Sequence, residues 1–230
     1  MALVVRAFPV DDRVRVDSFV REMHDRASEA REFYTSFGVR RETWFYQHHP
    51  RGAGSVVIGV TDVEDPLEPK AEQYAEASDS FATWFKAHVY ALSGVDPDTA
   101  PLGPPTEIVH DSSGGTLPTD GTLVVRAYPL QDRGGLQGFI GELREKRSET
   151  RGFYERHAAE EAWFLQNTDD GDIVIAVLAT NDPERAARTY AESKDPFDLW
   201  FKQRVIELSG IDPNRTPLGP PSEQIFDFIA

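Results

Sequence analysis

The chain of 230 residues carries 39 Asp and Glu against 24 Lys and Arg, giving a formal charge of −15, and it contains no cysteine. The negative charge disfavours nucleic acids and anionic membranes as partners, because phosphate groups are bound by clustered Lys and Arg. The missing cysteine excludes disulfides, thiolate nucleophiles and cysteine-ligated metal sites. Since no apolar run has the length of a membrane span, we expect a cytoplasmic protein.

The sequence repeats itself in tandem. The segment FATWFKAHVYALSGVDPDTAPLGPPTE (81–107) recurs as FDLWFKQRVIELSGIDPNRTPLGPPSE (197–223), with 16 of 27 positions identical and no gap. Each copy has about 105 residues, the size of one small domain. The intervening segment HDSSGGTLPTDG is rich in Ser, Gly, Thr and Asp, which is typical of a linker. We therefore predict one repeat at 1–109, a linker at 110–121 and a second repeat at 122–230.

The first half of each copy is predicted to contain three strands and a helical segment. In copy one, Leu3–Phe8 reads as a short strand bounded by Pro9. Apolar residues then recur at steps of three and four as far as Phe37, which indicates an amphipathic helical segment. Two strands follow at 42–48 and 55–61, and the glycine-containing HPRGAG between them predicts a hairpin.

The second half of each copy is predicted to contain two helices and a final strand. Asp-Pro pairs predict helix starts, with Asp as the N-cap, and Ser-Gly pairs predict helix ends. The Asp-Pro pairs stand at 65–66, 182–183 and 195–196, the helix at 80 starts after Asp79 alone, and the Ser-Gly pairs stand at 93–94 and 209–210. PLGPP must run extended. A last strand, at 107–111 or 223–228, is expected to close its own copy.

The order β-α-β-β-α-β predicts an α+β protein of two ferredoxin-like repeats. Apolar residues alternate onto both faces of the strands at 55–61 and 173–178, so helices on one face leave an apolar second face to be covered. We expect the other copy to cover it. The two repeats would then pack sheet to sheet as a single-chain dimeric α/β barrel, with Val57 and Val174 buried at that contact.

These features resemble the dimeric α/β-barrel superfamily, with the dimer fused into one chain. More narrowly, the motifs E-x-W-F-x-Q, DPFxxWFK and LSGxDPxxxPLGPP resemble a bacterial family of unassigned function whose members have about 100 residues, the size of one small domain. The resemblance covers nearly the whole chain twice. The resemblance implies that the chain belongs to one of several kinds of protein found in this superfamily: cofactor-free monooxygenases, aromatic cyclases, isomerising or dehalogenating enzymes, haem enzymes such as chlorite dismutase, and ligand-sensing modules. A shared fold does not choose among these.

An arginine interrupts the first apolar strand of each copy, at Arg6 and Arg126. A buried arginine is costly unless it is paired or lines a cavity. One interpretation is an anion or carbonyl clamp inside the barrel, which makes the arginines catalytic candidates. The other is a structural ion pair with Glu42 or Glu161, and we favour this one.

The second strand of each copy supplies the other candidates. Glu42 and Glu161 stand two positions before Trp44 and Trp163, and a carboxylate beside tryptophan in an enclosed site acquires a raised pKa suited to a catalytic base. The alternative is that each glutamate marks the wet end of its strand. The tryptophans are ligand-binding candidates. So are Gln47 and Gln166, which alternate onto the opposite strand face, and His48 at the hairpin.

Nothing in the sequence marks a metal or cofactor site. No histidine is repeated between the copies, and the pattern His-x-x-x-His does not occur. No phosphate-binding glycine loop or G-x-S-x-G elbow occurs either. The repeated Trp-Phe-Lys is expected to pack in the helical core, with Lys86 and Lys202 along its solvated flank. We therefore expect no cofactor, and haem of the chlorite-dismutase type is a weaker alternative.

The leading functional hypothesis is a small-molecule-binding barrel. It would act as a cofactor-independent enzyme of the monooxygenase, cyclase or isomerase kind on a small apolar or aromatic compound. The alternative is a structural or ligand-binding module without catalysis. The chain is expected to be a pseudo-dimer, and further self-association remains open.

Overall fold

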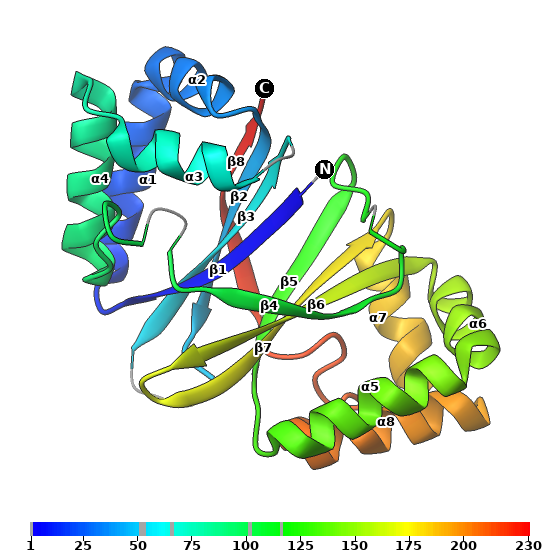
Figure 1. Cartoon of the computed structure of the whole chain (residues 1–230). Coiled ribbons are helices and arrows are strands. Elements are labelled where there is room, and N and C mark those ends of the chain that lie inside the picture. Colours follow the sequence, from blue (N-terminus) through cyan, green and yellow to red (C-terminus); the bar gives the residue numbers. More distant parts are fainter. Residues whose placement is uncertain (1, 51–53, 65–66, 101–102, 116) are drawn as a thin grey trace. The chain divides into compact units, whose positions relative to one another are not determined.

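The computed structural model describes residues 2–50, 54–64, 67–100, 103–115 and 117–230 (Figure 1). Within these residues the chain forms a mixed α+β fold with two four-stranded antiparallel sheets. Two compact units contain one sheet each. Unit 1 comprises Met1–Pro105 with Ser222–Ala230, and unit 2 comprises Thr106–Pro221.

Unit 1 contains a sheet in the order β1-β3-β2-β8 and four helices. Its strands are β1 (Ala2–Val10), β2 (Val39–His48), β3 (Ser55–Val63) and β8 (Ser222–Ile229). Its helices are α1 (Arg13–Asp25), α2 (Ala27–Ser36), α3 (Leu67–Glu76) and α4 (Ser80–Ser93).

Unit 2 repeats this arrangement with a sheet in the order β4-β6-β7-β5. Its strands are β4 (Thr106–Asp111), β5 (Thr122–Pro129), β6 (Ala159–Thr168) and β7 (Gly171–Thr180). Its helices are α5 (Arg133–Glu145), α6 (Arg147–His157), α7 (Pro183–Glu192) and α8 (Pro196–Ser209). The repeated α+β architecture is thus confirmed.

The two repeats exchange their last strands. The strand that ends the first copy, β4, pairs with β6 of unit 2, and the strand that ends the second copy, β8, pairs with β2 of unit 1. The prediction that each last strand closes its own copy was wrong, because alternation describes the faces of a strand and not the edge it joins. His110 and Asp111, predicted to begin the linker, belong to β4.

The helix caps predicted from the local sequence are present where the structure describes them. The side chain of Asp79 accepts hydrogen bonds from the amides of Phe81 and Ala82, which are left without partners at a helix start. Gly94 and Gly210 end α4 and α8 in the left-handed conformation, at φ of 70° and 74°. Asp182 caps α7, whereas Asp65-Pro66 lies outside the described residues. The amphipathic segment forms two helices in each copy instead of one.

The helices of each unit cover one face of its sheet. In unit 1, Phe19, Phe33 and Phe85 from three helices pack with Trp44 and Val63 of the sheet. Val57 and Val174 pack against these helix-side cores, so their predicted placement on the face turned away from the helices was wrong. Alternation separates two faces without telling which one the helices take. Residues of the opposite face, such as Ile58 and Val60, are also buried.

Candidate functional site

One cross-strand row of side chains crosses the centre of each sheet on its helix-covered face. In unit 1, the register pairs Arg6 with Gly59, Gly59 with Trp44, and Trp44 with Phe226. In unit 2, the corresponding row consists of Arg126, Ala176, Trp163 and His110. Paired residues on neighbouring strands point to the same side of a sheet. Sequence positions far apart in the chain therefore meet at one place beneath the helices.

A cavity lies between sheet and helices in each unit, with a volume of about 160 Å³ in unit 1 and about 100 Å³ in unit 2. The first is lined by residues that include Arg6, Phe19, Tyr34, Glu42, Trp44 and Gly59. The second is lined by residues that include Phe139, Tyr154, Glu161, Trp163, Ala176 and Phe201. An apolar protein cavity of about 150 Å³ holds benzene. The unit 1 cavity therefore has the size and lining for one small aromatic molecule, and the unit 2 cavity has a similar lining but a smaller volume.

A buried carboxyl group forms part of each cavity wall. In unit 1, Trp44 Nε1 donates a hydrogen bond of 2.6 Å to Glu42 Oε1. Loss of hydration raises the pKa of Glu42 from 4.5 to about 7, although hydrogen bonds from Thr61 and Trp44 oppose the rise. The same loss raises the pKa of Glu161 to about 7, against hydrogen bonds from Trp163 and Tyr154. Each carboxyl is therefore poised to exchange a proton near neutral pH.

The tyrosine above each carboxyl is bonded differently in the two units. Tyr154 Oη donates to Glu161 Oε2 at 3.1 Å and lies 2.9 Å from Nε2 of His110. Tyr34, at the aligned position of unit 1, is 5 % exposed, and its hydroxyl has no hydrogen-bond partner among the described residues. The ring of Phe226 occupies the register position that His110 has in unit 2. The two cavities therefore have corresponding tyrosine, glutamate and tryptophan residues in their walls but differ in the hydrogen bonds of the tyrosine.

The glycine of the repeated PLGPP motif forms another part of each wall. Gly103 lies against the ring of Phe8, and Gly219 lies against the ring of Tyr128, both with positive φ. A Cβ atom at either glycine would overlap the ring that it faces. Only glycine lets this backbone approach the aromatic side chain of the first strand so closely, which accounts for its presence in both copies.

The structure brings together some of the predicted site residues and separates others. Arg6, Glu42 and Trp44 line one cavity. Gln47 and Gln166 are buried on the opposite sheet face, so they do not line these cavities. His48 is exposed at the end of β2, with Nδ1 3.3 Å from the hydroxyl of Ser55.

The ion pair predicted between Arg6 and Glu42 stays a prediction. Arg6 donates to the carbonyl oxygen of Val5, and burial lowers its pKa. Arg126 donates in the same way to the carbonyl oxygen of Val125. Both arginines face the helix side of their sheets.

Sequence reasoning did not name the tyrosines or His110 as site residues. The signal was present in the comparison of the copies, where Tyr34 matches Tyr154 while His110 stands against Phe226. Only the exchange of last strands shows that His110 lies beside Tyr154 of unit 2 and not beside Tyr34 of unit 1.

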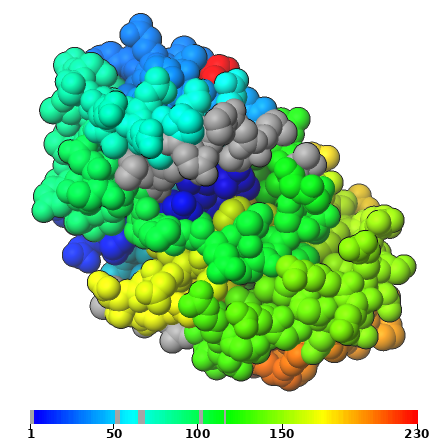
Figure 2. All heavy atoms as spheres, in the orientation of Figure 1, coloured from blue at the N-terminus to red at the C-terminus, as the bar shows by residue number. Residues whose placement is uncertain are grey.

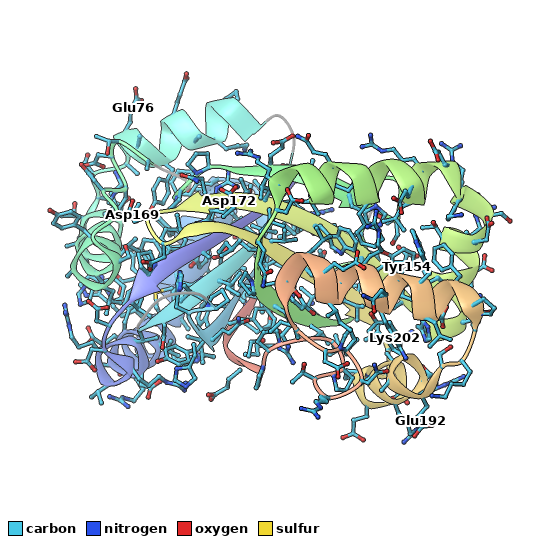
Figure 3. The ribbon with its side chains drawn as sticks, turned by 90° about the horizontal axis from the view of Figure 1, so that it is seen from below. Glu76, Tyr154, Asp169, Asp172, Glu192 and Lys202 are labelled. Carbon is cyan, nitrogen blue, oxygen red and sulfur yellow. The ribbon has the colours of Figure 1, made fainter. Side chains whose placement is uncertain are left out.

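The repeated lysines are buried, so the prediction of a solvated flank was wrong. Lys202, on α8, is 2 % exposed and donates to the carbonyl oxygens of Ala191 and Ser193 and to the side chain of Asn214 (Figure 3). Lys86 makes the same set of bonds to two carbonyls and Asp98. Carbonyl groups that lack partners at a helix end attract a cation strongly enough to hold it out of water.

The described residues contain no group of three or more His, Asp and Glu side chains arranged to hold a metal ion. Among the helices that the structure describes, none combines the length and apolar character that crossing a membrane requires.

No protein-family model matches this sequence, and no curated protein matches it. The crystal structure of an anthrone oxidase-like protein is similar in fold, with a TM-score of 0.47 and 11% sequence identity over 96% of this chain and 88% of that chain. A likeness at this level identifies neither a family nor an activity for this chain.

Proposed function

We propose that the protein binds a small aromatic or apolar molecule in its helix-sheet cavities and exchanges a proton with it through the buried carboxyl. The observation that supports this most is the position of Glu161, an acid with a raised pKa in the wall of a mainly apolar cavity of about 100 Å³. A polar group buried at such a cost is often functional.

The chemistry follows from the surroundings of the carboxyl. As a carboxylate, Glu161 accepts a proton from an acidic C–H or O–H of a molecule in the cavity. Tyr154 and Trp163 donate hydrogen bonds to it and stabilise its charged form. The apolar remainder of the wall excludes water and so strengthens these interactions. Proton removal beside a carbonyl or aromatic ring is the step common to isomerases, cyclases and cofactor-free oxygenases.

In unit 1 the proposed ligand carries one polar oxygen. A buried hydroxyl without a partner costs about 1–3 kcal/mol, and a ligand oxygen that meets the Tyr34 hydroxyl removes that cost. Tyr34 lines the cavity together with Glu42, so one ligand group reaches both side chains. A phenol or an aromatic ketone has the required form.

The alternative is binding without catalysis, and a specific observation favours it for unit 1. Glu42 there receives hydrogen bonds from Trp44 and Thr61 and has Phe226, in place of a histidine, in the neighbouring row. A pocket of this kind holds a ligand without a second titratable side chain beside the tyrosine.

Binding is tested with phenol and benzene as probes, followed by NMR and calorimetry. Each cavity is filled separately by Gly59→Leu in unit 1 or Ala176→Leu in unit 2. The expected result is saturable binding at two sites, of which each substitution removes one. Ala91→Leu, at an exposed position of α4, is the control and leaves both sites intact. Probe binding that survives both substitutions together would overturn the proposal.

Proton transfer is tested with 2-indanone, an aromatic ketone with acidic C–H groups. The rate of hydrogen–deuterium exchange at carbon is measured in D₂O by NMR, with and without protein. Acceleration that falls at least tenfold in Glu161→Gln, with 2-indanone still bound, supports the enzymatic form. Binding without acceleration supports the non-catalytic alternative.

A further inference from the structure

We propose that His110 and Tyr154 form a proton relay that connects Glu161, inside the cavity of unit 2, with an open groove on the surface of the same unit. The inference rests on the proposed role of Glu161 as a proton acceptor. Its test below uses the ligand-free protein, so the relay and the proposed function fail independently.

The hydrogen bonds form a continuous chain of three groups. His110 Nε2 lies 2.9 Å from Tyr154 Oη, and Tyr154 Oη lies 3.1 Å from Glu161 Oε2. The first distance is typical of a hydrogen bond, and the second is slightly longer than the usual range of about 2.5–3.0 Å for O–H···O bonds. The ring of His110 also lies 4.6 Å from that of Trp163, which fixes the orientation of the imidazole. Each member comes from a different element, namely β4, α6 and β6.

The two ends of this chain lie in different surroundings. Glu161 lines the small helix-sheet cavity, and His110 lines a wide groove of about 1290 Å³ formed by β4, the segment after it and helices α5 and α6. Tyr154 lines both. The segment after β4 and the two helices form much of the green surface on the near face in Figure 2. Tyr154 therefore lies between a small, mainly apolar cavity and a much larger surface groove.

Proton uptake proceeds in three coupled transfers. His110 receives a proton at Nδ1 from a hydronium ion in the groove, which becomes water, and releases the Nε2 proton to Tyr154 Oη. Tyr154 releases its own hydroxyl proton to Glu161 Oε2. The imidazole ends neutral with its proton on Nδ1, the tyrosine ends as a neutral hydroxyl, and the carboxylate becomes a carboxylic acid. Charge and protons balance, and the reverse sequence returns the proton to water.

The titratable groups around the relay are compatible with this sequence. Burial lowers the pKa of His110 to about 4, with Asp111 opposing the shift and Arg144 of α5 adding to it, so the imidazole stays neutral in the resting state. Burial also raises the pKa of Tyr154, as do the charges of Glu161 and Asp111 and the neighbouring Tyr190 of α7. Because neither side chain holds a net charge at neutral pH, both are suited to transferring a proton and not to retaining it.

Unit 1 provides a natural comparison within the same molecule. Phe226 stands where the relay has its imidazole, and the hydroxyl of Tyr34 has no hydrogen-bond partner among the described residues. Glu42 thus resembles Glu161 in burial and pKa but has no histidine above its tyrosine. Phe226 also demonstrates that a phenyl ring fits beside the tryptophan of this row, at 4.4 Å, so His110→Phe is sterically acceptable.

The relay is tested by NMR of protein labelled with ¹³C at the glutamate carboxyl carbon. Line shapes of Glu161 and Glu42 are followed from pH 5 to pH 9 in wild type, His110→Phe and Tyr154→Phe. The expected result is that the proton-exchange rate of Glu161 falls at least tenfold in both variants, while that of Glu42 is unchanged. Tyr154→Phe also raises the pKa of Glu161, because the charged form loses a donor, and His110→Phe changes that pKa less.

The outcomes separate the relay from a structural role. Slower exchange at Glu161 alone, in folded variants with wild-type amide spectra in unit 1, supports it. An unchanged Glu161 rate in His110→Phe would overturn it. An equal fall at Glu161 and Glu42 would also overturn it, because a general change in local opening then explains the effect.

Discussion

The imidazole Nε2 of His157 lies 2.9 Å from Oδ2 of Asp198, whose side chain is fully buried and also pairs with Arg156. The aligned residues of unit 1 are Phe37 and Ala82, both buried. A polar pair in one copy thus corresponds to an apolar pair in the other. Both residues of the pair differ between the copies, so neither copy has a buried polar side chain facing an apolar one at these two positions.

This exchange predicts strong coupling between the two positions. Asp198→Ala leaves Nε2 of His157 without its acceptor and Arg156 with Asp195 as its remaining carboxylate partner. The variant is expected to lower the free energy of unfolding by about 3 kcal/mol. His157→Phe with Asp198→Ala restores the pair found in unit 1 and is expected to recover at least half of the loss. Urea unfolding of both single variants and the double variant measures the coupling. Additive losses would contradict the interpretation.

The buried carboxyl of Glu161 predicts a stability that falls as pH rises. Its folded pKa of about 7 lies above the unfolded value of 4.5, so the native state binds more protons between these values. The free energy of unfolding therefore decreases from about pH 5 to pH 8, by about 3 kcal/mol for this group. Glu161→Gln mimics the neutral acid and removes that dependence.

The measurement compares wild type with Glu161→Gln at pH 5 and pH 8. The variant is expected to gain stability relative to wild type at pH 8 and to differ least at pH 5. Glu160→Gln, at the exposed neighbouring position of β6, is the matched control. The lowered pKa of His110 makes stability rise with pH below pH 6.5, opposite to the effect of Glu161. This contribution is the same in wild type and in Glu161→Gln, so it cancels in their comparison. A difference independent of pH would refute the prediction.

The close approach of glycine to an aromatic ring predicts a specific intolerance. Gly103→Ala and Gly219→Ala each place a methyl group into the ring of Phe8 or Tyr128 at positive φ. Each is expected to cost about 2–4 kcal/mol, from backbone strain and overpacking together.

Gly114→Ala is the matched control for these substitutions. Gly114 has φ of 73°, but nothing lies within 4 Å of an added Cβ atom, so only the cost of about 1 kcal/mol for positive φ applies. Thermal unfolding of the three variants separates the two contributions. Equal losses of stability at all three positions would show that the rings of Phe8 and Tyr128 move aside at no cost in free energy.

The buried lysine predicts a loss of stability without a loss of the fold. Lys202→Met keeps the length of the side chain and removes its donors from the carbonyl oxygens of Ala191 and Ser193. The expected cost is about 2–4 kcal/mol, because both partly buried acceptors lose their charged donor. Lys194→Met, at an exposed position, is the control and is expected to change stability by less than about 0.5 kcal/mol. Thermal unfolding distinguishes the two.

Local features of this protein were decided by its sequence. The repetition of 81–107 at 197–223, the caps at Asp79 and Gly94, and the shared strand face of Glu42 and Trp44 all follow from residue type and spacing. Caps and alternation depend on contacts between residues a few positions apart, and such contacts are written in the local sequence.

Only the tertiary structure decided which distant residues meet. The exchange of β4 and β8 places His110 above Tyr154 and Glu161, and Phe226 above Trp44, a choice that the identical pattern of the two last strands leaves open. The burial of Lys202 and the raised pKa of Glu161 likewise arise from packing. Strand pairing, burial and desolvation depend on residues that the whole fold brings together, so residue spacing along the chain does not determine them.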